Sequence, residues 1–251
     1  MKYMSAGLIV AAAALSLTAA AADIRADMAA FDRAYIPVYA LTSEGAWEQA
    51  RKAVRVALRA WVEFRDSYYN AKTTDAAWRS DLDRVHALFY DANALLDGRQ
   101  PELALEPLKR VRAIMMNLRQ RNGIAYYLDD LVAFSEPMES IVLTATRGEA
   151  TGDSIAKVRA LLPAAQQAWT RAAEAEPGGA FALTAAQREE LYRRRDAETA
   201  ALDALKKALA SNERAAIASA AAGIKPPFDR LYYFFGDFHG LMWVELPPAK
   251  Q

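Results

Sequence analysis

The chain has 251 residues, of which 31 are Lys or Arg, 31 are Asp or Glu, two are His and none is Cys. This balance of charge argues against nucleic-acid binding, which depends on a positive field over the binding surface. The lack of cysteine excludes a disulfide framework, covalent c-type haem, iron–sulfur clusters, thiolate zinc and a cysteine nucleophile. Two histidines also exclude a three-histidine metal site.

The first 22 residues have the features of a secretory signal peptide. A basic start precedes the uncharged apolar run Ala6–Leu17, which is too short for a membrane span of about 20 residues. The small residues Ala20–Ala22 then stand directly before the charged Asp23, as at a cleavage site. We therefore expect a soluble mature chain of residues 23–251, periplasmic or secreted, with no transmembrane segment.

The rest of the chain has the pattern of amphipathic helices. It is rich in alanine, the best helix former, and its apolar residues recur at helical spacing, as at Trp47, Val54 and Trp61. No segment shows a convincing strand alternation. Helices are predicted at about 24–42, 45–70, 75–97, 101–121, 125–147, 153–175, 184–210, 212–222 and 227–245.

Local signals mark several of these helix ends. Thr184 followed by Gln187 predicts a capping box at the start of helix 184–210. Asn122-Gly123 predicts the end of helix 101–121, because glycine suits the left-handed position after a helix. The short loops between helices favour antiparallel packing of neighbours, as in helical bundles.

Short sequence matches recur about 100 residues apart and indicate an internal duplication. The matches are Asp27–Phe31 with Asp130–Phe134, Ala60-Trp61 with Ala168-Trp169, and Gly123-Ile124 with Gly223-Ile224. The predicted fold is all-α: two tandem four-helix-bundle-like units and a closing C-terminal aromatic helix. Unit 1 is expected at 23–123 and unit 2 at 124–251, with the closing helix at 227–245.

The sharpest candidate for a metal site is His239 with Met242. On a helix these residues lie on one face, and imidazole with thioether suits copper or a non-covalent haem iron. A haem needs ligands on both sides of the ring, so the second ligand would come from elsewhere. The candidates for it are Met138, Met115, Met116 and His86. The alternative is that His239 and Met242 pack within an aromatic core.

Three other clusters have a structural and a functional interpretation. The carboxylates of segment 129–139 form either a hard-cation site or a solvated acidic face. The arginines of helix 101–121 either meet an anionic partner or pair with the acidic segment 129–139 of the same protein. The aromatic run Tyr232–Phe235 either fills the bundle core or lines a pocket for an apolar ligand.

No motif of a known catalytic class occurs, and no catalytic residue is assigned. The favoured function is a non-catalytic binding or scaffold module of the cell envelope, with a protein or a small apolar molecule as its partner. A periplasmic metal- or haem-binding bundle is the first alternative, and an enzyme of unrecognised type is the second.

Overall fold

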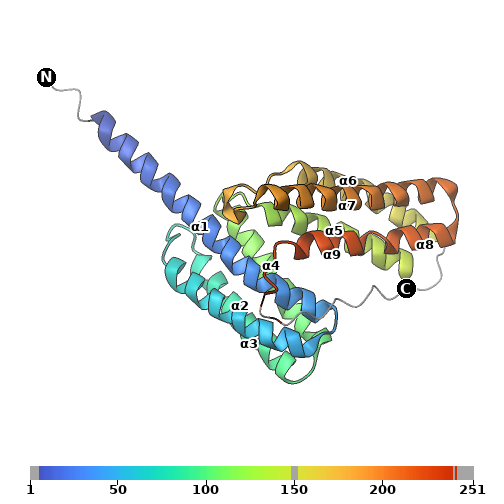
Figure 1. Ribbon diagram of the computed structural model, residues 1–251, viewed down its shortest axis with the longest axis horizontal. Helices are drawn as coiled ribbons and strands as arrows, with labels where there is room; N and C mark the ends of the chain where they lie inside the picture. Colours follow the sequence, from blue (N-terminus) through green and yellow to red (C-terminus); the bar gives the residue numbers. More distant parts are fainter. Residues whose placement is uncertain (1–5, 148–151, 240, 242–251) are drawn as a thin grey trace. The chain divides into compact units, whose positions relative to one another are not determined.

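The computed structural model describes residues 6–147, 152–239 and 241, and within these ranges all regular structure is helical (Figure 1). The chain forms two compact units. Unit 1 comprises the chain up to Ala125 together with Gly179–Phe181, and unit 2 comprises the remainder from Tyr126. The division lies close to the predicted one at residue 123.

Unit 1 is a four-helix bundle. Its helices are α1 (Ala6–Ser43), α2 (Trp47–Tyr68), α3 (Trp78–Asp97) and α4 (Pro101–Arg121). Each helix packs against the next, and α4 returns to pack against α1, so the four helices form a closed ring. The short 3₁₀ helix Gly179–Phe181 also packs on α1, where the Phe181 carbonyl accepts a hydrogen bond from Arg33 at 2.9 Å.

Unit 2 repeats this order with one change. Its helices are α5 (Tyr127–Thr146), α6 (Gly152–Glu174), α7 (Ala185–Ser211), α8 (Arg214–Ala222) and α9 (Lys225–Tyr233). The helices α5, α6 and α7 pack in sequence, and both α8 and α9 pack against α5 and α7. The pair α8–α9 therefore has in unit 2 the neighbours that the single helix α4 has in unit 1.

Each core contains the same aromatic pair. The ring centroids of Phe31 and Trp61 are 5.2 Å apart in unit 1, and those of Phe134 and Trp169 are 5.2 Å apart in unit 2. These residues belong to the matches that predicted a duplication, and they join the first and second helices of each unit. The all-α fold with two tandem bundle-like units is confirmed.

The helix pair α8–α9 is interrupted at Gly223-Ile224 (Figure 1). Pro226 and Pro227 follow after Lys225, and proline cannot donate the backbone hydrogen bond that would continue the helix. Gly223 has φ −70°, whereas Gly123 has φ +63° and follows the end of α4. The two Gly-Ile pairs are therefore not equivalent: the first ends a four-helix unit, and the second lies inside the fourth helical segment.

The closing helix α9 is shorter than predicted. It ends at Tyr233 and not at residue 245, and residues 234–239 form turns and irregular chain. The amides of Phe235 and Gly236 bond to carbonyls three residues back, which tightens and ends the helix. Asp237 then accepts a bond from the His239 amide at 2.9 Å, a local turn that competes with helix.

The predicted capping box of α7 is confirmed. The Gln187 amide donates to Thr184 Oγ1 at 3.2 Å, and the Thr184 amide donates to Gln187 Oε1 at 2.9 Å. Within the part of the chain that the structure describes, no helix has both the length and the apolar character needed to cross a membrane.

Candidate functional site

The residues predicted to bind a metal lie in different settings. His239 is exposed in the turn that follows α9, so it is not part of a helix face. Met138 is buried on α5, and Met242 lies outside the described residues. Among the described residues, no three His, Cys, Asp or Glu side chains come together in a way that would hold a metal ion. Copper or haem binding at His239 stays a prediction, without the helical spacing on which it was based.

The other predicted haem ligands lie in the core of unit 1 or at its edge. Met115 is buried on α4, and Met116 beside it is half-buried. His86 on α3 is half-buried, and its ring lies edge-on to Tyr90 with centroids 5.0 Å apart. His86 therefore takes part in an aromatic contact at the boundary of the bundle.

The aromatic run near the C-terminus fills the core of unit 2. Phe228 lies 5.5 Å from Phe134 and stacks on Tyr232 at 6.2 Å between ring centroids. Phe235 is also buried and lies 5.3 Å from Tyr127. These contacts account for the aromatic run by burial, the first of its two interpretations.

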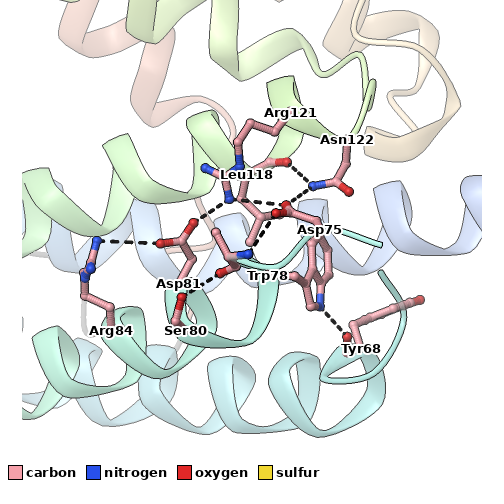
Figure 2. A network of polar contacts seen from close by, with 10 residues as sticks. Tyr68, Asp75, Trp78, Ser80, Asp81, Arg84, Leu118, Arg121 and Asn122 are labelled. Carbon is pink, nitrogen blue, oxygen red and sulfur yellow. Dashed lines mark hydrogen bonds and ion pairs between the residues drawn. The ribbon is translucent and has the colours of Figure 1, made fainter. Parts of the chain in front are cut away.

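Arg121 at the end of α4 pairs with acidic residues inside unit 1 (Figure 2). Arg121 Nη2 lies 2.5 Å from Asp81 Oδ2 and 3.4 Å from Asp75 Oδ2. Asn122 donates to the same Asp75 oxygen at 2.8 Å, and this bond, with the backbone and Arg121, holds the pKa of Asp75 below its usual value. The hydrogen bond to Asp81 raises the pKa of Arg121. The network fastens the loop before α3 to the end of α4.

A second set of bonds closes the same end of the bundle. The Trp78 indole donates to the Tyr68 carbonyl at 2.8 Å, which joins the start of α3 to the end of α2 (Figure 2). Arg84 Nη1 lies 3.7 Å from Oδ1 of Asp81, the carboxyl oxygen that Arg121 does not contact. Since every group here has a partner within unit 1, we interpret the network as structural.

A shallow groove of about 490 Å³ runs between α3 and α4 on the surface of unit 1. Its apolar lining consists of Leu88, Ala94, Leu95 and Pro107. Leu88 and Pro107 are buried, so they form the floor, while Leu95 is half-buried. The volume falls in the range of about 300–1,000 Å³ that is typical of ligand sites, but the groove is open to solvent.

Three charged residues border this groove: Asp91 on α3, and Glu106 and Arg110 on α4. All three are exposed, and none has an ion pair or side-chain hydrogen bond among the described residues. Some other exposed charges of unit 1 do pair, as Arg65 does with Asp83 at 2.7 Å. The groove therefore combines an apolar floor with charges of both signs that have no partner within unit 1.

Large apolar side chains lie exposed near the same groove. Leu103 is 59% exposed and lies one turn before Pro107 on α4. Tyr90 is 55% exposed and lies one turn before Ala94 on α3. Our sequence prediction missed this surface. The available signal was Leu103 itself, which falls outside the apolar stripe formed by Leu108, Val111, Met115 and Leu118.

Unit 2 contains two buried charged side chains on α7, Arg195 and Glu198. Arg195 has several partners: it donates to the Ala175 carbonyl, lies 3.3 Å from the Tyr127 hydroxyl and lies 3.4 Å from Glu176 Oε1. Burial raises the pKa of Tyr127, and the nearby Arg195 opposes that rise. Arg195 thus fastens the loop after α6 to α5 and α7, which is again a structural role.

Comparison with known proteins identifies no relative. No family model, no curated protein and no solved structure matches the chain.

Proposed function

We propose that the protein is an exported, non-catalytic binding module of the cell envelope, and that the groove between α3 and α4 is its binding surface. The observation that carries this proposal is the set of unpaired charges, Asp91, Glu106 and Arg110, around an apolar floor. Exposed charges without partners in the fold contribute little to its stability, and at an interface such charges provide specificity.

The occupant that fits the groove best is an amphipathic helix of a partner protein. Two antiparallel helices with a groove between them accept a third helix that places its apolar side chains on the groove floor. A small apolar molecule would leave the three charges unused and would remain exposed to water, because the groove is open. A partner helix with an acidic group for Arg110 and a basic group for Asp91 or Glu106 satisfies both the apolar and the charged parts.

Site-specific photo-crosslinking tests this surface. A photoreactive residue in place of Ala94, which is exposed and lines the groove, should form an adduct with a partner protein in cells that export the chain. Adding Arg110→Glu should weaken the adduct about tenfold or more, because reversal of a charge across an interface costs at least about 1.4 kcal/mol. Arg110 is exposed and unpaired, so the helical circular dichroism should not change.

The matched control places the photoreactive residue at Val56, which is exposed on α2 outside the groove. Adducts of equal yield at Ala94 and Val56 would contradict the proposal, because they would report unspecific proximity. An adduct at Ala94 that survives Arg110→Glu unchanged would show that a small apolar or uncharged occupant uses the groove instead.

Export has its own test. The small residues Ala20–Ala22 before Asp23 support cleavage after Ala22. N-terminal sequencing of the protein from the extracytoplasmic fraction should therefore begin at Asp23. Recovery of a chain that still begins with Met1 in the soluble extracytoplasmic fraction would contradict the cleavage, and recovery in the cytoplasm alone would contradict export.

A further inference from the structure

Glu198 occupies a core position of α7. The buried stripe of this helix is formed mainly by leucines, and Glu198 stands among them with a side-chain exposure of 0%. These leucines are Leu191, Leu202, Leu205 and Leu209. Neither carboxyl oxygen of Glu198 has a hydrogen-bond partner among the described residues. An ionised carboxylate without a partner is strongly unfavourable in such a position, so the group is expected to be neutral in the folded protein.

The electrostatic surroundings of Glu198 favour the neutral form. Burial raises the pKa of Glu198 to about 9, the negative charge of Asp229 on α9 adds to the rise, and Arg230 opposes it. Lys225, the remaining cation of α9, is paired with Asp229. Arg230 is therefore the cation of α9 that has no acidic partner among the described residues. Its side chain is exposed to solvent.

The other elements packed against α7 supply no closer countercharge. The ionisable side chain of α8 is that of Arg214, at the start of that helix. Beside Glu198, α6 contributes Trp169, whose indole donates to Thr199 at 2.9 Å. The charge of Arg171 on α6 acts instead on Asp130 of α5, where it opposes the rise in pKa that burial causes. On α7 itself, Arg194 and Arg195 pair with Glu190 and Glu176. Loss of the Glu198 proton would thus create a buried charge that has no partner.

The helix opposite Glu198 is suited to move. Helix α9 spans Lys225–Tyr233, and the break at Gly223-Ile224 with Pro226 and Pro227 separates it from α8. Its first backbone bond, from the Phe228 amide to the Ile224 carbonyl, is long at 3.4 Å. Few backbone bonds therefore tie α9 to the preceding helix. Its docking on α7 depends on side-chain packing and on the hydrogen bond that Arg194 of α7 donates to the Arg230 carbonyl at 2.5 Å.

We infer that a proton on Glu198 holds α9 against α7, and that loss of this proton releases α9 from the unit 2 bundle. In the released state the carboxylate reaches water, and the apolar side chains of Phe228, Leu231 and Tyr232 become accessible. The docked state retains the proton up to alkaline pH, and the released state ionises like an ordinary carboxylic acid near pH 4.5. Docking is therefore strongest below that pH and weakens as pH rises towards about 9. This device is independent of the groove on unit 1.

Native-state hydrogen exchange of the full mature chain between pH 5 and pH 9 tests the inference. After correction for the intrinsic pH dependence of exchange, the opening constant of the α9 amides should rise by up to about tenfold per pH unit between pH 5 and pH 8. Glu198→Gln cannot ionise and should abolish this rise. Glu198→Leu should abolish it as well and should also protect α9 more strongly, because leucine completes the apolar stripe.

The matched control is Asp203→Asn, which removes an exposed carboxylate from the same helix and should leave the rise unchanged. A pH dependence that persists in both Glu198 variants would overturn the inference. So would α6 amides that lose protection in parallel with those of α9, because the proton would then be linked to unfolding of the whole unit. A wild-type opening constant that does not depend on pH would overturn it too.

Discussion

Trp61→Ala should cost about 3–5 kcal/mol of stability, the range found when a fully buried aromatic side chain is truncated. Trp61 is 0% exposed and contacts three phenylalanines, Phe31, Phe64 and Phe89, with centroid distances of 5.2, 5.7 and 6.2 Å. Its removal deletes one member of this cluster and leaves a cavity that the surrounding helices fill only in part. Urea denaturation followed by circular dichroism measures the loss.

The control for this prediction is Val56→Ala on the same helix. Val56 is exposed on α2, so its truncation should change stability by less than about 0.5 kcal/mol. A chain of two units need not unfold in one step, so hydrogen exchange of α1–α4 should be measured alongside denaturation. If Trp61→Ala and Val56→Ala lowered the free energy of unfolding by equally small amounts, the Phe31–Trp61 pair would not be the centre of the unit 1 core.

Arg119→Met should cost about 3–5 kcal/mol, as expected when one partner of a buried ion pair is removed. Arg119 is 2% exposed, and its Nη1 atom lies 4.0 Å from Asp32 Oδ2, which is also buried. The variant would remove a buried cation from beside the buried Asp32 carboxylate. Thermal unfolding at neutral pH measures the effect, and Arg110→Met, which alters an exposed and unpaired arginine on the same helix, should leave the midpoint nearly unchanged.

The second unit of the chain supplies the compensating change for this variant. Ser135 follows Phe134 as Asp32 follows Phe31, and its hydroxyl donates to the Val132 carbonyl at 2.8 Å. A serine hydroxyl at position 32 should likewise donate to the backbone carbonyl three residues earlier. Asp32→Ser combined with Arg119→Met should therefore recover part of the lost stability. A double variant no more stable than Arg119→Met would show that the Asp32 carboxylate is not the cause of the loss.

The interior position of these charges was not predictable from helical spacing. Arg119 appeared in the sequence as one of several arginines on a basic helix, and nothing in the helical spacing pointed to Asp32. The structure pairs it with Asp32 of α1, which is far away in sequence. The buried position of Glu198 was easier to predict from the sequence. Glu198 stands seven residues after Leu191 and four before Leu202, in line with the apolar stripe of α7.

The sequence by itself determined the helical class, most helix positions and the existence of two units. These features depend on local propensity and on the spacing of apolar residues within one helix, and both can be read along the chain. The Phe–Trp pair of each unit also followed from the sequence matches, because a repeated motif that supplies core residues is expected to pack in the same way twice.

Tertiary structure alone decided the end of α9 at Tyr233, the place of α8–α9 as the fourth element of unit 2, and the groove between α3 and α4. It also decided which charges are paired, as at Asp32 and Arg119, and which have no ion pair within the described part of the chain, as at Asp91 and Arg110. The physical reason is that these features depend on distances between segments remote in sequence. The periodicity of one helix says which face is buried, but it does not say which side chain of another helix meets that face.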